Sequence, residues 1–374
     1  MSMSQIISVS CKLQVPVKVR QEIDETLQRF ADGCNQILEV SQREKIKNTT
    51  KLHHATYYDV RAKTGLKANH VCQAIRRVVG AVTAQKKQIH KFRPTSMSLA
   101  VRTFSYDEVK QVVGVTLLNG RVKIPLSIGN YQLALLKGQT PTSAVLCKRR
   151  NGAYDIQIQV EVPTQPPNQT PRVLGVDVGQ RDIAHTSTGL SWSGEQIRKA
   201  RNHFQHVRSS VQSKCTRGAK KLLKRLSGRE RRFQANINHT ISRQLVNEAQ
   251  RIDAAIAFED LTGIRQRTKV RRTQRRLHHS WAFYQLRQFT AYKALIAGVR
   301  LVLVDPRYTS QTCHNCLHIH PEQGKTYRNG KNYECGHCGW HGDSDFNAAN
   351  VISLLGVSLS VPESNWVSCI LQGV

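Results

Sequence analysis

Two pairs of cysteines near the C-terminus constrain the fold of this 374-residue chain more than any other feature. They lie in "CHNC" and "CGHC" and give the spacing C-x2-C-x18-C-x2-C, formed by Cys313, Cys316, Cys335 and Cys338. Each C-x2-C turn directs two thiolates at one ion, and two such turns complete the tetrahedral shell of a structural Zn²⁺. A nearby histidine could replace one cysteine in that shell. The spacing therefore predicts a zinc ribbon whose ion has no open position for water.

The remaining cysteines and the N-terminal residues indicate where such a chain works. Ten cysteines are too few for a disulfide scaffold in a chain of this length, and six of them are scattered, which is typical of a reducing compartment. The start "MSMSQIISVS" lacks the basic and apolar regions of a signal peptide. No uninterrupted apolar run reaches the roughly 18 residues of a membrane span. We expect a protein of the bacterial or archaeal cytoplasm, associated with the nucleoid.

The charge of the chain is strongly positive and clustered. Lys and Arg number 56 against 25 Asp and Glu, which gives a formal net charge of +31 and a pI of about 10.2. One basic stretch runs from Arg198 to Arg232 with Glu230 as its single acid, and a second, "RQRTKVRRTQRR", covers 265–276. Such blocks can be merely solvated faces, but a surplus of this size favours a nucleic-acid partner. The candidate contacts are Lys67, Arg76, Arg77, Lys220, Lys221, Lys224, Arg225, Arg231, Arg232, Arg271, Arg272, Arg275 and Arg276.

The first 165 residues alternate between strand and helix signals. Apolar residues alternate over the first 16 residues, and a helical period then covers 17–92, predicting an insert of about three helices. Strand signals return over 93–165, where "LLNGRVKI" and "KRRNGAYDIQIQV" each place Asn-Gly between alternating runs, the pattern of a hairpin. The simplest architecture is one small β-barrel interrupted by helices. The proline-rich "PTQPPNQTP" (163–171) then marks a domain boundary.

After that linker the pattern resembles βαβ units and predicts an α/β domain over 172–310. Its strands are "RVLGVDVG", "DAAIAFED" and "VRLVLVD", a long basic helical stretch covers about 195–250, and a later helix carries Trp281, Phe283, Leu286, Phe289 and Leu295. The zinc ribbon is an insert over 311–341, the last helix covers 342–356, and an apolar tail covers 357–374. The predicted fold class is α/β plus a β-barrel.

Three acids at the ends of apolar segments require a reason in so basic a chain. Asp177 lies inside "GVDVG", Glu259 ends "AIAFE", and Asp345 begins a helix rich in small residues. Singly, each could close a turn, pair with an arginine or cap a helix. Together they could hold two Mg²⁺ ions about 4 Å apart, with Mn²⁺ able to substitute, for cleavage of a phosphodiester. Three neighbouring acids we assign to structural roles: Asp343 suits an N-cap, and Asp182 and Asp260 flank the candidates without joining them.

These motifs, in this order, resemble the TnpB family of insertion-sequence proteins. The resemblance covers about 172–352 and rests on "GVDVGQRDIA", "RRFQANINHTISRQLV", "AFEDLTGIR", "HSWAFYQLRQFTAYKALIAG", "PRYTSQTCHNC" and "CGHCGWHGDSDFNAANVI". The first third resembles the family only in plan, as a wedge-type barrel split by a small helical recognition lobe. Leu317 is a departure, because these ribbons usually carry glycine after the second cysteine.

The resemblance implies an RNA-guided DNA endonuclease with a RuvC nuclease domain of the RNase H superfamily. Asp177, Glu259 and Asp345 match its catalytic acids, and the family's D-x-N-A-A pattern selects Asp345 over Asp343. It further implies a guide RNA from the transposon end and a double-stranded DNA target beside a short flanking motif. The sequence does not determine the oligomeric state, and a monomer is slightly favoured. Alternatives are a non-cleaving RNA-guided regulator and a CRISPR-associated miniature type V effector. A strand-transferring transposase is disfavoured by the order Asp–Glu–Asp.

Overall fold

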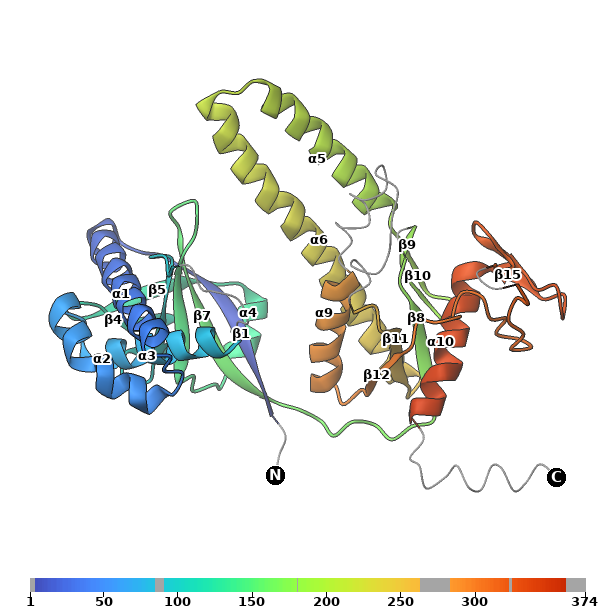
Figure 1. Ribbon diagram of the computed structural model, residues 1–374, viewed down its shortest axis with the longest axis horizontal. Helices are drawn as coiled ribbons and strands as arrows, with labels where there is room; N and C mark the ends of the chain where they lie inside the picture. Colours follow the sequence, from blue (N-terminus) through green and yellow to red (C-terminus); the bar gives the residue numbers. More distant parts are fainter. Residues whose placement is uncertain (1–3, 85–90, 180, 263–282, 323–324, 361–374) are drawn as a thin grey trace. The chain divides into compact units, whose positions relative to one another are not determined.

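The computed structural model describes residues 4–84, 91–179, 181–262, 283–322 and 325–360 (Figure 1). The chain divides into two compact units, Ser4–Pro163 and a second unit that starts at Thr164, the beginning of the proline-rich segment. Part of the sequence-based prediction lies outside the described residues: the basic run 265–276, with Arg271, Arg272, Arg275 and Arg276, and Trp281 of the predicted helix.

The first unit is built on a seven-stranded antiparallel sheet. The strands are β1 (Ser4–Leu13), β2 (Ser96–Ala100), β3 (Phe104–Asp107), β4 (Val112–Thr116), β5 (Arg121–Ser127), β6 (Ser143–Lys148) and β7 (Tyr154–Pro163). They lie in the order β2-β6-β7-β1-β5-β4-β3, so the first strand of the chain pairs with two strands that follow the helical insert. Both Asn-Gly hairpins are confirmed, as the β4–β5 and β6–β7 pairs.

The predicted β-barrel does not close in the described residues, because β2 and β3 remain the two edges of an open sheet. A barrel requires hydrogen bonds between its edge strands. The Arg77 guanidinium instead donates to the Ser96 carbonyl (3.0 Å) and the Ser96 hydroxyl (2.6 Å) at the edge strand β2. A side chain of the helical insert thus takes an edge acceptor that a closing strand would use.

The helical insert contains three long helices, as predicted. They are α1 (Val17–Arg43), α2 (Thr49–Thr64) and α3 (Ala68–Ala84), and a short α4 (Asn130–Leu136) follows β5. The apolar stripe of α1 is buried from Ile23 through Phe30 to Leu38. Asn48 caps α2 through its side chain, and Gly65 ends that helix in the left-handed region at a φ of 67°.

The second unit contains a five-stranded mixed sheet in the order β10-β9-β8-β11-β12. Its strands are β8 (Val173–Asp177), β9 (Asp182–Thr186), β10 (Ser191–Ser193), β11 (Ala255–Glu259) and β12 (Leu301–Val304). The three predicted strands are confirmed as the parallel set β8, β11 and β12. The antiparallel strands β9 and β10 were not predicted, because "DIAHT" and "SWS" are short and only partly apolar.

The long basic stretch is helical over its predicted range, and it consists of two helices that form a hairpin. Helices α5 (Glu195–Ser213) and α6 (Arg217–Arg251) run side by side, separated by a turn in which Cys215 has a φ of 49° (Figure 1). The single acid of the stretch, Glu230, forms an ion pair with Arg208 across the hairpin at 2.6 Å. No helix in the described part of the chain has the length and apolar character needed to cross a membrane.

Helices cover both faces of the second sheet. Helices α6 and α9 (Phe283–Ile296) pack on one face, and α10 (Ser344–Ser360) packs on the other. Within α9, Leu286 is buried as predicted, whereas Leu295 is 41% exposed. Helix α10 continues four residues past its predicted end. Before it, β13 (Arg328–Asn329), β14 (Asn332–Glu334) and β15 (His341–Asp343) form a small antiparallel sheet that belongs to the cysteine-rich insert.

Candidate active site and metal centre

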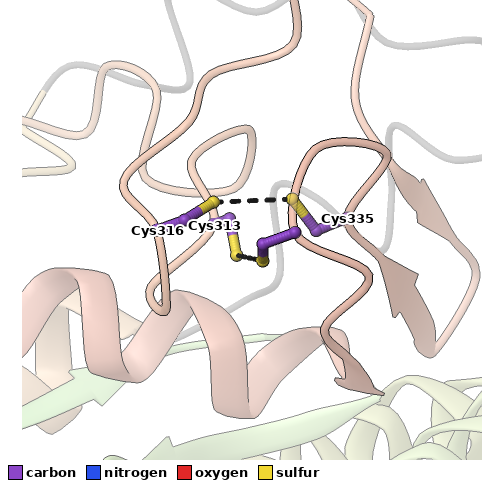
Figure 2. Close-up of side chains that lie close together, drawn as sticks. Cys313, Cys316 and Cys335 are labelled. Carbon is purple, nitrogen blue, oxygen red and sulfur yellow. Dashed lines mark hydrogen bonds between the residues drawn. The ribbon is translucent and has the colours of Figure 1, made fainter.

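The four cysteines form one compact cluster in the second unit. Their sulfur atoms all lie within 4.8 Å of one another, and the cluster brings Cys313 Sγ to 3.8 Å from Cys338 Sγ and Cys316 Sγ to 3.7 Å from Cys335 Sγ (Figure 2). Zn–S bonds of about 2.3 Å in a tetrahedron place neighbouring sulfurs about 3.8 Å apart. The cluster therefore fits a structural Zn²⁺, with no histidine needed to complete it.

Both cysteine turns end in the same backbone conformation although their sequences differ. The residue after the second cysteine of each turn, Leu317 in one and Gly339 in the other, has a positive φ, of 58° and 72°. Each donates its backbone N–H to the carbonyl of the first cysteine, at 2.9 and 3.0 Å. Leucine pays a steric cost in this region that glycine does not. Leucine in place of the usual glycine at position 317 therefore leaves the geometry of the turn intact, but it strains the backbone.

The alternation of side chains along β8 and β11 puts two predicted acids on one face of the sheet. Val173 of β8 and Ala257 of β11 pack with α10, whereas Val176 and its neighbour Phe258 pack with α6 and α9. Since side chains alternate along a strand, Asp177 and Glu259 belong to the face that α10 covers. Phe258 pairs with Val176 in the parallel ladder, so the two acids follow at adjacent positions on neighbouring strands.

Helix α10 brings the third acid to the same end of that face. A Cβ at Gly175 would lie 2.0 Å from the Ala349 carbonyl oxygen, so only glycine lets the helix approach β8 this closely. Gly356, near the other end of the helix, faces Val173. The helix therefore runs antiparallel to β8, and its first turn, with Asp345, lies toward Asp177.

The electrostatics of the two strand acids agree with this convergence. Burial, together with the negative charges of Glu259 and Asp345, raises the pKa of Asp177 to about 8. Burial also raises the pKa of Glu259, against a hydrogen bond that its carboxylate accepts from the Thr309 hydroxyl. The charges of Glu259 and Asp345 thus disfavour ionisation of Asp177, which creates a demand for cations at this place.

Two cations from the cysteine-rich insert meet part of this demand. Asp345 is 5% exposed, and its carboxylate accepts from the Arg328 guanidinium at 2.9 Å and lies 3.1 Å from Lys331 Nζ. Lys331 also pairs with Asp182 and lies 3.7 Å from Asp343 Oδ2. Sequence reasoning missed both cations, because they come from the β13–β14 hairpin, and spacing alone does not connect that hairpin to the acids.

The other acids near the site have structural partners. The Asp343 carboxylate accepts from the backbone N–H groups of Asp345 (2.7 Å) and Phe346 (3.1 Å), which is the predicted N-cap of α10. Asp260 pairs with Arg287 at 2.9 Å and accepts from Thr262, so it is turned to its own loop. The assignment of Asp343, Asp182 and Asp260 as neighbours agrees with these contacts.

The spacing of the three acids differs from that of the cysteines. Among the described residues, the cysteines are the one group of three or more metal-ligating side chains whose ligand atoms all lie within 4.8 Å of one another. The carboxylates of Asp177, Glu259 and Asp345 are spread more widely than the shell of a single ion.

The predicted nucleic-acid contacts are divided between the two units. In the first unit, Arg76 on α3 is exposed and Lys67 is half-buried, while Arg77 is engaged by Ser96 and lies over the Phe30 ring at 5.8 Å. In the second unit the described candidates are all exposed along α6 (Lys220, Lys221, Lys224, Arg225, Arg231 and Arg232). The α5–α6 hairpin thus presents the basic surface, and Arg77 stabilises the first unit.

Comparison with known proteins gives a consistent set of relatives. The family described as "Cas12f1-like, TNB domain" matches residues 283–352. The chain is 23% identical over 373 residues to the CRISPR-associated endodeoxyribonuclease Cas12f1 of Sulfoacidibacillus thermotolerans, covering 87% of this chain and 86% of that protein. It is 29% identical over 165 residues to the TnpB-like protein MJ0751 of Methanocaldococcus jannaschii, covering 40% of this chain and 58% of that protein.

Solved structures share the fold at low sequence identity. A Cas12f1 in complex with sgRNA and target DNA matches with a TM-score of 0.68 and 13% identity, over 90% of this chain and 83% of that one. The mini-RNA-guided endonuclease CRISPR-Cas_phi3 matches with a TM-score of 0.58 and 9% identity, over 96% and 93%. The chain is thus similar to TnpB-like proteins and to Cas12f effectors, in its sequence and in its fold.

Proposed function

We propose that this chain is an RNA-guided DNA endonuclease that uses divalent metal ions to hydrolyse a phosphodiester bond. The observation that carries the proposal is the raised pKa of Asp177, which burial and the charges of Glu259 and Asp345 cause at the end of the sheet face that α10 covers. The strand order β10-β9-β8-β11-β12, with β9 antiparallel to the other four strands, supports a RuvC nuclease domain of the RNase H type. Relatives named as endodeoxyribonucleases support the same reading.

Asp177, Glu259 and Asp345 would hold two Mg²⁺ ions. When bound, these ions would supply an activated water and would stabilise the leaving oxygen of the phosphodiester. The residues of the chain set the geometry: Thr309 orients the Glu259 carboxylate, and the N-cap formed by Asp343 fixes the first turn of α10.

The remaining parts of the proposed assembly follow from charge and from the relatives. We assign the exposed lysines and arginines of α6 to the phosphates of a guide RNA from the transposon end and of target DNA beside a short flanking motif. In such effectors base pairing reads the sequence, and the protein reads the duplex shape and the flanking motif. The first unit would act as wedge and recognition lobe, and the cysteine cluster would hold the structural Zn²⁺ beside the nuclease acids.

A reconstituted cleavage assay tests the proposal. The RNA that copurifies with the protein is sequenced, and a DNA library carrying the complementary target beside a randomised flank is incubated with the complex and Mg²⁺. We expect cleavage by the wild type, none by Asp177→Ala or Glu259→Ala, and unchanged RNA retention in both variants, because phosphate contacts dominate RNA affinity. Guided binding without cleavage by the wild type would support the non-cleaving regulator instead. Near-normal cleavage by either variant would exclude the assigned acids.

The relatives include both a TnpB-like protein and CRISPR-associated effectors. The sequence of the copurified RNA distinguishes these contexts. A transcript of the transposon end supports the transposon-encoded nuclease that we propose, whereas a CRISPR repeat supports a miniature type V effector.

A further inference from the structure

The side chain of Asn347 connects the cysteine cluster to the helix that carries Asp345. Asn347 is fully buried on α10, two residues after Asp345. Its Oδ1 accepts from the backbone N–H of His314 at 2.9 Å and lies 2.9 Å from His314 Nδ1, and its Nδ2 donates to the Thr312 carbonyl at 2.8 Å. Thr312 and His314 flank Cys313, so one amide holds the peptide groups on both sides of a cluster cysteine.

The first turn of α10 depends on such outside contacts. The first N–H groups of a helix have no partners within the helix, so the turn is positioned by caps and neighbouring segments. Besides the Asp343 cap, the backbone N–H of Ser344 donates to the Lys331 carbonyl at 2.7 Å. The β13–β14 hairpin thus holds one side of this turn, and the Asn347 amide fastens the other side to the first cysteine turn.

We propose that Asn347 is a positioning residue that couples the ion in the cysteine cluster to the placement of the Asp345 carboxylate. The ion fixes Cys313, the peptide groups beside Cys313 fix the Asn347 amide, and Asn347 fixes the helical turn that presents Asp345. The cysteine cluster then does more than fold its own insert, because it sets the position of one metal-binding acid. An effect of this coupling on DNA cleavage rests on the proposed function. The coupling itself can be measured without DNA.

The alternative is that Asn347 only fills space, as a buried side chain between α10 and the cysteine-rich insert. The ring of His314 packs edge-on against Trp340 (4.4 Å) and Phe346 (5.8 Å) and provides apolar contact there in any case. A leucine at position 347 would retain comparable volume and remove all three polar contacts of the amide. Asn347→Leu therefore separates filling from positioning, and Asn347→Ala removes both.

The test measures Mn²⁺ binding to the full-length, zinc-loaded protein by electron paramagnetic resonance of the free ion. Asn350 supplies a matched control on the same helix, since its amide donates at 2.9 Å to the Phe346 carbonyl of α10 itself. We expect Asn347→Leu to raise the Kd of the acid site for Mn²⁺ about 10–100-fold, the range for residues that orient metal ligands. Zinc content and retained guide RNA should stay at wild-type levels, and Asn350→Leu should bind Mn²⁺ as the wild type does.

Several outcomes decide the matter. Wild-type Mn²⁺ affinity in zinc-loaded Asn347→Leu would overturn the coupling. Should Asn347→Leu lose zinc, the measurement is made on zinc-loaded Asn347→Ala, in which wild-type Mn²⁺ affinity would likewise overturn the coupling. Loss of zinc from both variants would show that Asn347 supports the cluster itself, and would also overturn the proposal. If the wild type binds Mn²⁺ at a site that Asp177→Asn removes, but cleaves no guided DNA, the proposed function fails while the coupling stands.

Discussion

The raised pKa of Asp177 makes a quantitative prediction about folding. Burial, with the charges of Glu259 and Asp345 nearby, raises this pKa from a reference value of 3.8 to about 8. A carboxyl whose pKa is higher in the folded than in the unfolded state binds more protons when folded, so it favours folding most below pH 4 and loses that contribution as the pH rises to 8. In protein without divalent metal, Asp177 should therefore make the second unit less stable as the pH increases.

Asp177→Asn should remove this loss because asparagine stays neutral. Each pH unit between the two pKa values changes the free energy of unfolding by about 1.4 kcal/mol. From pH 5 to pH 7 the wild type should lose about 3 kcal/mol relative to the variant, and at pH 7 the variant should be more stable by about 4 kcal/mol. The second figure is a ceiling, because Asp177 is partly exposed and solvent screens part of the repulsion.

Tryptophan fluorescence provides the assay. All four tryptophans of the sequence lie after residue 164, so their emission reports the unfolding of the second unit alone. Urea unfolding of zinc-loaded protein is followed at pH 5, 6, 7 and 8 without Mg²⁺. Asp305→Asn removes an exposed acid that follows β12 and serves as the control for a lost charge. A stability difference between Asp177→Asn and wild type that stays constant with pH would refute the argument.

Three further predictions test other parts of the structure. Thr309→Val removes the hydroxyl that donates to Glu259, so the pKa of Glu259 should rise further. The pH profile of cleavage should therefore shift to higher pH, and cleavage should require more Mg²⁺. An unshifted profile would contradict this role of Thr309. Leu317→Gly relieves the positive φ of the first cysteine turn and should stabilise the insert by about 1 kcal/mol, seen as slower zinc release to a chromogenic chelator; faster release would contradict the strain argument. We further consider alanine at four exposed basic positions of α6: Lys220, Lys221, Lys224 and Arg225. The slope of log K for duplex DNA against log salt concentration should become shallower by about 3–4. An unchanged slope would show that this helix does not contact the DNA.

Local patterns were sufficient to predict the elements whose side chains repeat with a regular period. The parallel strands β8, β11 and β12 have continuous apolar runs, the α1 stripe has a helical period, and both hairpins have Asn-Gly turns; all are confirmed. Strands β9 and β10 carry little periodic signal and depend on pairing with β8. The helical hairpin was missed for a related reason: the break at Cys215 needs only one residue of positive φ, which no glycine or proline marks in the sequence.

Long-range contacts explain what the sequence could not provide. At the open edge of β2, Arg77 donates to Ser96, although the charge pattern of the sequence assigns this arginine to nucleic acid. Likewise, the cations that neutralise Asp345 belong to a hairpin whose position is set by the cysteine cluster. A lone basic residue in a sequence this basic carries no signal of its partner, so these contacts become visible only once the chain is folded.

One glycine shows how fold and site depend on the same contact. In the sequence, Gly175 is the first glycine of "GVDVG", and a glycine in a strand permits another backbone to approach closely. In the fold, the backbone of α10 takes the place of its missing side chain, at Ala349 and Ser353, and any Cβ would push the helix away from β8. Because Asp345 is one helical turn before Ala349 and Asp177 is two residues after Gly175, that displacement would separate the two acids. The close contact of strand and helix therefore determines whether one pair of ions can be shared between them.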